Sequence, residues 1–425
     1  MSSLLIADTT FTKILQEIPA EVGMLAREFG AFSRKRAIRT PEELLRAVLL
    51  YSGLDQSLRE VAANFTQSGC RLSDEAVRWR LSACEEWLQE IVSAMMPKQE
   101  DEKVADGLRF KIVDSTCIQA PGAVTGDYRL HLLWDHGKQR LGDLLLTDTR
   151  TAESLQLFEW QEGDVVLADA GYAKAEQLAA VKARGAEYVV RCAPKQIRLY
   201  LQDGERLNIV NELQKAELGK QVISMSVMIN TKGGLQPAWL HAYRLPEEKA
   251  REARRRLKRR AQKKYGGKVS NQMLFLVDWV LLLTSLPPEV APAKVVGQLY
   301  RGRWQIEIVI KRLKSLLNLD ALRARRGSRL AKVYLLGKLL YSLIIERRTL
   351  RIKRTRDVQW RLWKLIARQI KAGIAFPYQD GRHIDADVLH VLRERPRKRK
   401  LLKNQIAKSI KIVSDTYVGN RGLQP

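Results

Sequence analysis

Residues 164–191 have the sequence DVVLADAGYAKAEQLAAVKARGAEYVVR, and this stretch decides the fold class. The run 164–168 is nearly continuously apolar, as expected for a strand that is covered on both faces. Helix-forming residues follow over 174–184, and the run 187–191 predicts a second strand. A strand, a helix and a strand in close succession favour an α/β sheet.

The segments upstream of this stretch extend the predicted sheet. Runs rich in β-branched, aromatic or leucine residues predict strands over 108–119, 128–134 and 142–146. A short helix is predicted over 152–160. The resulting order is three strands, a helix, a strand, a helix and a strand, which predicts a sheet of mixed direction.

The flanking regions have apolar residues at helical rather than strand-like spacing. Helical patterns recur over residues 10–97, and the helices predicted over 57–65 and 73–87 are separated by a short break that contains glycine. Such a pair is either a DNA-binding helix-turn-helix that carries Arg78 and Arg80 or an ordinary packing unit. From about residue 291 the pattern is helical again.

The interval 195–290 interrupts the α/β rhythm. It contains a strongly basic segment, 247–264, with ten Lys or Arg and three acidic residues, which predicts an exposed basic helix. Its β-like pieces are predicted at 206–211, 221–230, 238–244 and 273–284. We therefore expect a β-rich unit with a basic helix inside it.

Charge is abundant and unevenly distributed. The chain has 425 residues and a formal net charge of +27. Residues 301–425 hold 32 basic against nine acidic residues, whereas residues 1–100 hold 12 against 14. Excess positive charge of this size favours a polyanionic partner, most commonly nucleic acid. An anionic membrane surface and a merely solvated basic surface are the alternatives.

Several protein classes are disfavoured. The four cysteines show neither CxxC nor Cys/His spacing, which argues against a disulfide scaffold and a zinc site. No stretch reaches the roughly 18 apolar residues of a membrane helix, and the N-terminus lacks the basic region of a signal peptide. We expect a cytoplasmic, nucleoid-associated protein without a membrane partner.

The segment Gln298–Leu317, QLYRGRWQIEIVIKRLKSLL, carries an unusual set of side chains. On one continuous helix, five of them would fall within an arc of about 80°. These are Tyr300, Arg303, Glu307, Lys311 and Lys314. The alternative is a solvated face on which Glu307 and Lys311 form a common i,i+4 pair.

Two aspartates elsewhere in the sequence favour a functional site over a merely solvated helix face. Asp114 lies inside an otherwise apolar strand, and Asp169 directly follows the apolar run 164–168, where it could also cap the next helix. Together with Glu307 they make an oxygen-rich site suited to Mg²⁺ or Mn²⁺. Two such ions can stabilise both oxygens of a phosphodiester displacement, so metal chemistry and basic charge point to the same substrate.

These motifs resemble those of bacterial insertion-sequence transposases of the DDE class, in the subgroup with a Tyr-Arg-Glu-Lys signature. The signature spacing is Tyr, two residues, Arg, three residues, Glu, six residues, Lys, and residues 300–314 match it without a gap. Asp114-Ser115-Thr116 and Asp169-Ala170-Gly171-Tyr172 resemble the first and second aspartate motifs of the family. The resemblance covers roughly residues 35–350.

The resemblance implies a ribonuclease-H-like catalytic core with a mostly β insertion, hence an α/β fold. It implies that Asp114, Asp169 and Glu307 bind two divalent ions and catalyse cut-and-paste DNA cleavage and strand transfer. Tyr300, Arg303, Lys311 and Lys314 would then contact DNA phosphates, with Tyr300 orienting a phosphate through its hydroxyl rather than acting as a nucleophile. The implied partners are inverted-repeat ends, target DNA and a second subunit.

Some relatives stack a tryptophan on a base flipped from the cleaved end. Trp279 lies in a suitable place, although it could equally be a core residue of the apolar run 274–286. The expected organisation has five parts. They are a helical, DNA-end-binding unit (1–100), the first part of the core (101–194), the insertion (195–290), the catalytic helix (291–350) and a basic helical region for DNA contact or dimerisation (351–425).

Three other functions stay open on the sequence alone. A sequence-specific endonuclease of the same fold would cut DNA without joining strands. A DNA-binding regulator would bind terminal repeats without metal-dependent cleavage, and a decayed copy would be inactive. The regulator has no need of Asp114, Asp169 and Glu307, whose presence therefore favours an enzyme.

Overall fold

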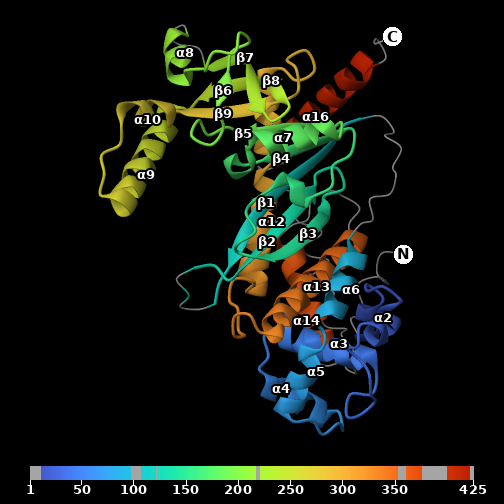
Figure 1. Cartoon of the computed structure of the whole chain (residues 1–425). Helices are drawn as coiled ribbons and strands as arrows, with labels where there is room; N and C mark the ends of the chain where they lie inside the picture. The colour runs from blue at the N-terminus through green and yellow to red at the C-terminus, as the bar shows by residue number, and fades with distance from the viewer. Residues whose placement is uncertain are drawn as a thin grey trace.

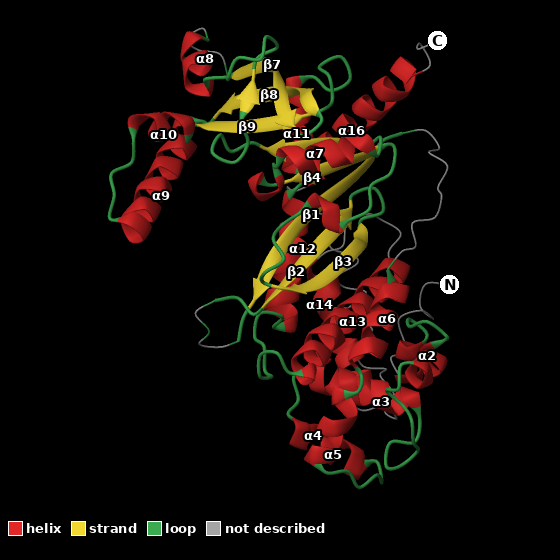
Figure 2. Ribbon diagram, in the orientation of Figure 1, coloured by secondary structure: helices red, strands yellow, loops and turns green. Residues whose placement is uncertain are grey.

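The structure is a computed structural model, and it describes residues 11–96, 107–120, 123, 125–216, 221–352, 360–375 and 400–421. A sheet region with several helices around it lies at one end of the molecule, and a body made of helices lies at the other (Figures 1 and 2). The predicted α/β class is confirmed, because one nine-stranded sheet of mixed direction joins the strands of the described chain.

The strand order in this sheet is β3-β2-β1-β4-β5-β9-β8-β7-β6. Strands β1, β4 and β5 run parallel, and the remaining neighbours pair antiparallel. The strands are β1 Arg109–Ile118, β2 Tyr128–Asp135, β3 Arg140–Asp148, β4 Asp164–Ala168, β5 Glu187–Arg191, β6 Leu199–Tyr200, β7 Val222–Thr231, β8 Gly234–Arg244 and β9 Trp279–Thr284. The β-rich interval is thus continuous with the rest of the sheet through the β5–β9 pair.

Helices cover both faces of the sheet, which explains the apolar run of β4. Side chains alternate across a strand, so Val165 and Leu167 join one core while Val166 and Ala168 join the other. Helix α7 (Ala175–Ala183) packs on the second face. Helices α11 (Ala293–Arg301) and α12 (Trp304–Leu317) pack on the first.

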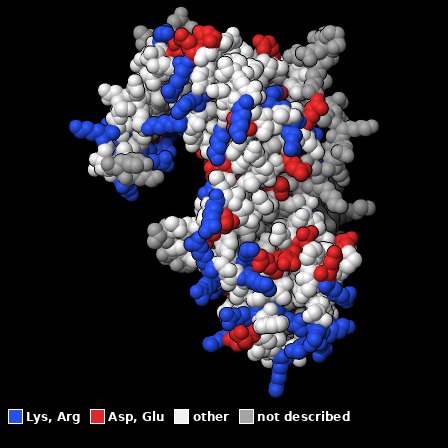
Figure 3. All heavy atoms as spheres, viewed as in Figure 1, with Lys and Arg blue, Asp and Glu red and all other residues white. Residues whose placement is uncertain are grey.

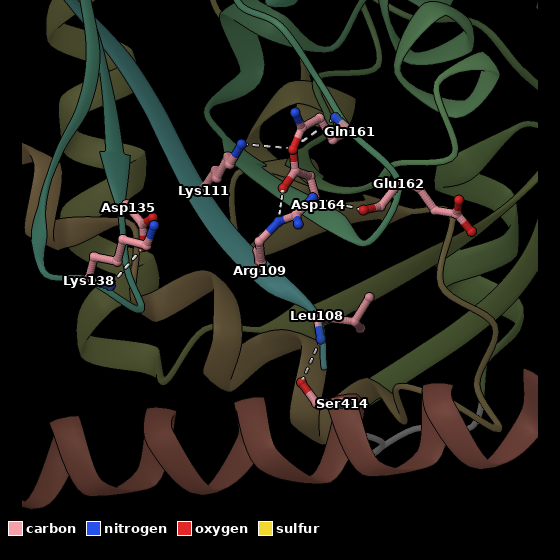
Figure 4. A network of polar contacts seen from close by, with 9 residues as sticks. All are labelled: Leu108, Arg109, Lys111, Asp135, Lys138, Gln161, Glu162, Asp164 and Ser414. Atoms are coloured by element: carbon pink, nitrogen blue, oxygen red, sulfur yellow. Dashed lines mark hydrogen bonds and ion pairs between the residues drawn. The ribbon is translucent and has the colours of Figure 1, made fainter. Parts of the chain in front are cut away.

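A buried carboxylate fixes the start of the parallel pair β1–β4 (Figure 4). Asp164, whose side chain is fully buried, accepts hydrogen bonds from Arg109 Nε and Lys111 Nζ, each at 2.8 Å. The backbone amide of Gln161 donates to the same carboxylate at 2.9 Å. Because the charge is paired and fully hydrogen-bonded, these contacts hold β1 and β4 in one register.

The helical body combines the N-terminal helices with two helices, α13 and α14, that follow the sheet in the sequence. The first six helices are α1 Phe11–Leu15, α2 Val22–Glu28, α3 Pro41–Val48, α4 Leu58–Gln67, α5 Asp74–Ser82 and α6 Glu85–Met95, with a π-helical turn, η1, at Leu49–Gly53. Helix α13 (Arg329–Ile352) packs against α6 and η1, and α14 (Trp360–Ala375) packs against α13. The part of the chain after the sheet therefore returns to the N-terminal helices.

Three local predictions were wrong, each because side chains offered other hydrogen bonds. The helix expected over 152–160 is only a 3₁₀ turn, η2 (Leu155–Leu157), since Gln177 and Trp160 bond to the backbone of Leu155. The strand expected over 206–211 gives way to α8 (Ile209–Lys215), and the first half of the strand expected over 273–284 is helix α10 (Asn271–Leu276). Asn208 and Ser270 cap these two helices.

The helix predicted over 73–87 is in fact two helices, α5 and α6, which meet at 83–84. The predicted basic helix is α9 (Glu247–Tyr265), which stands out from the sheet region together with α10 (Figure 1). Helix α16 (Lys400–Arg421) packs against α11, where Ser409 Oγ donates to Gln298 Oε1 at 2.6 Å. Within the described ranges, no helix combines the length and apolarity that crossing a membrane would require.

Candidate active site

One predicted aspartate, Asp114, lies in β1, and the other, Asp169, directly follows the neighbouring strand β4. In the parallel β1–β4 pair, Ile112 is the register partner of Leu167. Asp114 and Asp169 each follow two residues later, and the side-chain period of two places them on the sheet face of Ile112 and Leu167. That face is the one covered by α11 and α12. The sheet thus presents both carboxylates to the helices that carry the signature residues.

The signature segment is not the single helix that was predicted. It breaks at residues 302–303 into α11 and α12, and i→i+3 hydrogen bonds tighten the junction, among them Gly302 N to Leu299 O at 2.8 Å. A Cβ on Gly302 would lie 2.9 Å from that carbonyl oxygen, so glycine suits the turn. Tyr300 therefore belongs to α11, and Arg303 occupies the N-cap of α12.

Arg303 bridges two of the predicted acids. Its Nη1 donates to Asp114 Oδ2 at 3.2 Å, and its Nη2 donates to Glu307 Oε1. The Arg303 and Asp114 side chains are only 16% and 19% exposed, whereas Glu307 is 54% exposed. Glu307 thus pairs with the residue four positions before it, and not with Lys311 as the alternative interpretation expected.

Tyr300 connects the third acid to the same group. Its hydroxyl donates to Asp169 Oδ1 at 3.4 Å, and the Arg303 guanidinium lies 5.9 Å from the centroid of its ring. Asp114, Asp169, Tyr300, Arg303 and Glu307 therefore form one connected cluster, although they come from two strands, two helices and a turn.

The electrostatics of the cluster are those of crowded carboxylates. Burial raises the pKa of Asp114 to about 6, and the nearby Asp169 and Glu153 carboxylates act in the same direction. The Ser115 amide, which donates to Asp114 Oδ1 at 2.8 Å, and Arg303 partly offset this pKa shift.

The tyrosine of the cluster is a hydrogen-bond donor rather than an anion. Burial raises the pKa of Tyr300, and the neighbouring Asp169 carboxylate raises it further. The phenol therefore stays protonated at neutral pH. A protonated hydroxyl can orient an acceptor oxygen, which agrees with an orienting role.

Glu153 is a site residue that the sequence did not reveal. Ser115 Oγ donates to Glu153 Oε1 at 2.8 Å, and Arg129 Nη1 lies 3.9 Å from the same oxygen. Gly171 leaves room for this carboxylate, because a Cβ there would overlap it. The segment 152–160 had been predicted to be helical, and no spacing motif links Glu153 to Asp114. The contact exists only in the folded protein.

The remaining predicted residues lie outside the connected cluster. Lys311 is exposed and Lys314 half-buried on α12, one and two turns beyond Glu307. Trp279, at the start of β9, is 8% exposed and lies 6.4 Å from Phe275 between ring centroids. In this conformation its ring belongs to the core, so stacking on a DNA base would first require it to emerge.

The cluster fits a divalent cation in its donor chemistry. All of its anionic groups are carboxylates, the ligands that Mg²⁺ and Mn²⁺ prefer. Burial is the main cause of the raised pKa of Asp114, the Asp169 and Glu153 carboxylates add to it, and a bound cation would favour the ionised form. Among the described residues, no three acids, histidines or cysteines are already close enough to hold one ion. The guanidinium of Arg303 lies between Asp114 and Glu307 instead.

Comparisons with known proteins agree with this chemistry. The family model of the transposase DDE domain matches residues 106–343. The chain is 36% identical, over 77% of its length and 90% of theirs, to the InsL protein of insertion sequence element IS186A from Escherichia coli K12 and to the transposase for insertion sequence element IS421 from Escherichia coli.

The chain also has more distant likenesses. The transposase for insertion sequence element IS231F from Bacillus thuringiensis subsp. israelensis is 28% identical over 55% of this chain and 54% of its own. A piggyBac transposase, solved as a synaptic complex with hairpin DNA, superposes with a TM-score of 0.45 at 10% identity, over 96% of this chain and 84% of that one. On the family match and the 36% identity, the chain belongs to the DDE transposases of bacterial insertion sequences, enzymes that bind DNA, cleave it and transfer its strands, generally with divalent metal ions.

Proposed function

We propose that this transposase binds the inverted-repeat ends of its own element and cuts and joins DNA at Asp114, Asp169 and Glu307. One observation carries the assignment of the site. Asp114 in β1 and Asp169 directly after β4 are joined, through Arg303 and Tyr300, to the glutamate of a helix that arrives more than a hundred residues later. Carboxylates gathered from such distant segments are costly to bury unless the site uses them.

The strand order supports a ribonuclease-H-like core. Strands β1 to β3 form an antiparallel meander, and β4 and β5 add to β1 in parallel, which gives the order β3-β2-β1-β4-β5. Strands β6 to β9 then extend the sheet as the insertion that precedes the catalytic helix. In this proposal α12 is that helix, because it carries Glu307 across the face where Asp114 lies.

Asp114, Asp169 and Glu307 would together hold two divalent ions, Mg²⁺ or Mn²⁺. Bound there, such ions would supply Lewis-acid activation of the attacking oxygen and charge stabilisation of the leaving oxygen in a phosphodiester displacement. The Ser115 amide orients Asp114 for this role, and the hydroxyl of Tyr300 orients Asp169. Glu307, the most exposed of the three, is the acid that is freest to reposition.

The cations of the signature would contact the DNA backbone. Arg303 offers a planar pair of donors that suits a phosphate as well as a carboxylate, and Lys311 and Lys314 continue along the same helix. A phosphate that captures Arg303 would release Asp114 and Glu307 at the same time. Substrate binding and assembly of the site are thereby linked.

Helices α4 and α5 are our candidates for reading the element ends. They lie at the far end of the helical body, where Figure 3 shows Lys and Arg side chains gathered. Trp79 on α5 is 78% exposed between Arg78 and Arg80. An exposed aromatic residue flanked by cations suits a nucleic-acid surface. We further propose that two subunits pair the two ends of the element.

A cleavage assay tests this function. Labelled DNA with the element's ends is incubated with the protein and Mg²⁺ or EDTA, alongside Asp114→Asn, Glu307→Gln and the control Asp143→Asn. Asp143 matches Asp114 closely, because it is also a half-buried strand aspartate whose Oδ1 accepts the next backbone amide, at 2.7 Å.

We expect Mg²⁺-dependent cuts at the ends, followed by joining to target DNA, from the wild type and Asp143→Asn only. Cutting without joining would indicate an endonuclease. Binding without cutting would indicate a regulator or an inactive copy. Equal cleavage by Asp114→Asn and the wild type would contradict the proposed site.

A further inference from the structure

Helix α9 stands apart from the rest of the protein. It spans Glu247–Tyr265, and Figure 1 shows it projecting from the sheet region beside α10. It makes no extensive contact with another described helix or strand, and Ala250 in its first turn is its one buried residue among those whose side chains are described. A 19-residue helix that packs so little contributes little to the core, which raises the question of what it contacts.

The charge of α9 is concentrated beyond its first two turns. The helix holds ten Lys or Arg and three Glu. Its ion pairs lie near the start, where Arg251 and Arg254 contact Glu247 and Lys249 contacts Glu252. Among the described residues, the following cations have no carboxylate partner: Arg255, Arg256, Lys258, Arg259, Arg260 and Lys263.

These unpaired cations share one face of the helix. At about 100° per residue, all but Lys258 fall within an arc of about 140°. Arg255, Arg259 and Lys263 form a row with an axial spacing of about 6 Å. The opposite side carries Ala253, Leu257 and Ala261, which are half-buried. One side of α9 is therefore turned toward the protein and the other presents charge to solvent.

The base of α9 is fixed to the sheet. Arg254 Nη1 lies 3.2 Å from Asp278 Oδ2, and the Leu245 amide donates to the Asp278 carbonyl at 2.8 Å. Asp278 directly precedes β9, so both chain segments at the base are joined to the same strand end. The charged face is consequently held in a set direction relative to the sheet.

The chemistry of α9 identifies its partner as a polyanion. A membrane surface is disfavoured, because interfacial helices bury a broad apolar face, and over 247–263, where the side chains of α9 are described, that face would consist of alanines and one leucine. Figure 3 shows further Lys and Arg side chains along the edge of the molecule below α9. A row of cations continued over the body suits an extended, evenly charged ligand.

We propose that α9 is a DNA-binding arm that holds duplex DNA by its phosphates, independently of sequence. The arm adds a second contact to the DNA engaged at the active site. The choice of DNA as the polyanion rests on the proposed function, whereas the presence of a polyanion site on α9 rests on the helix alone.

The test compares two variants with equal loss of charge. The arm variant carries Arg255→Gln, Arg256→Gln, Arg259→Gln and Arg260→Gln, and glutamine preserves helix propensity. The control carries glutamine at four exposed cations on other elements: Arg184, Arg198, Arg206 and Lys232. Binding to random duplex DNA, element-end DNA and duplex RNA is measured in EDTA at several salt concentrations, so that cleavage plays no part. Circular dichroism confirms that both variants are folded.

Phosphate contacts determine the expected result. Each phosphate contact contributes about 0.9 to the slope of log affinity against log salt concentration. Loss of four contacts in the arm variant would therefore lower the magnitude of this slope by up to about 3.6. We expect the arm variant to bind both DNAs at least about tenfold more weakly, with a reduced slope, while the control changes little.

Three results would overturn the proposal. The first is an arm variant that binds DNA with the same affinity and salt dependence as the control. The second is a loss of affinity that is confined to element-end DNA. The third is wild-type protein that binds duplex RNA more tightly than duplex DNA. Cleavage of element ends by the wild type tests the proposed function separately, so failure of one proposal is distinguishable from failure of the other.

Discussion

Replacing Arg303 with glutamine should increase the affinity of the DNA-free protein for divalent metal ions. The guanidinium bridges Asp114 and Glu307, so an ion that uses both carboxylates has to displace it. Arg303 and Asp114 are both largely buried, and a charge-assisted hydrogen bond in such a setting is worth about 1.5–3 kcal/mol. Glu307 is 54% exposed, so solvent screening reduces its contact to about 0.2–1 kcal/mol.

The lower ends of these ranges sum to about 1.7 kcal/mol, and about 1.4 kcal/mol corresponds to a tenfold change in affinity. We therefore expect Arg303→Gln to bind Mn²⁺ at least about tenfold more tightly than the wild type. Isothermal titration calorimetry at pH 8 measures this, because Asp114, with a pKa of about 6, is then ionised.

Arg301→Gln is the matched control, since Arg301 is exposed two residues away and carries the same charge. Binding of element-end DNA should tighten Mn²⁺ binding by the wild type and leave Mn²⁺ binding by Arg303→Gln nearly unchanged. DNA phosphate and Mn²⁺ both require the Arg303 bridge to break, so the binding of one removes that cost for the other. If Arg303→Gln binds Mn²⁺ no more tightly than Arg301→Gln, the bridge does not oppose metal binding and the reasoning fails.

Two further predictions concern the framework around the site. Asp164→Ala should lower the free energy of unfolding by about 3–5 kcal/mol, because it leaves Arg109 and Lys111 without their buried partner. Urea denaturation measures this, and a loss below about 1 kcal/mol would show that the network does not hold β1 to β4. Glu346 on α13 is a buried acid whose Oε1 accepts a hydrogen bond from the Leu141 amide of β3 at 3.0 Å. Burial raises its pKa from 4.5 to about 7, so the stability it contributes is fully present below pH 4.5 and lost as pH rises through 7. Between pH 4.5 and 8.5 the stability of Glu346→Gln relative to the wild type should improve by about 3 kcal/mol, and parallel pH profiles of the two proteins would contradict this assignment.

The sheet was predictable because its core strands are apolar on both faces. The runs 164–168 and 187–191 match β4 and β5 residue for residue, and the strand predicted over 221–230 lies within one residue of β7. Errors arose where single side chains redirect the backbone, as Gln177 does at Leu155. The Gln177 contact joins residues that are far apart in sequence, so local periodicity does not contain it. The caps Asn208 and Ser270 act on the third residue after them and are local signals that the apolar pattern overrode.

The site was predictable in its residues but not in its geometry. The signature spacing identified Tyr300, Arg303 and Glu307, yet a continuous helix was assumed where Gly302 allows a tight junction. The bridge from Arg303 to Asp114 depends on that junction and on the β1 register, neither of which a motif specifies. Glu153 was not predicted for the same reason, since its hydrogen bond with Ser115 and its effect on Asp114 depend on the folded backbone.

The central claim is that Asp114 binds the catalytic metal, and replacing it with cysteine tests this most directly. A thiolate is a softer ligand than a carboxylate and holds Mn²⁺ better than Mg²⁺. End cleavage by Asp114→Cys should therefore be lost with Mg²⁺ and partly recovered with Mn²⁺, while Asp143→Cys should cleave with both ions. If Asp114→Cys keeps the wild-type ratio of Mg²⁺-supported to Mn²⁺-supported cleavage, Asp114 is not a metal ligand and the account is contradicted.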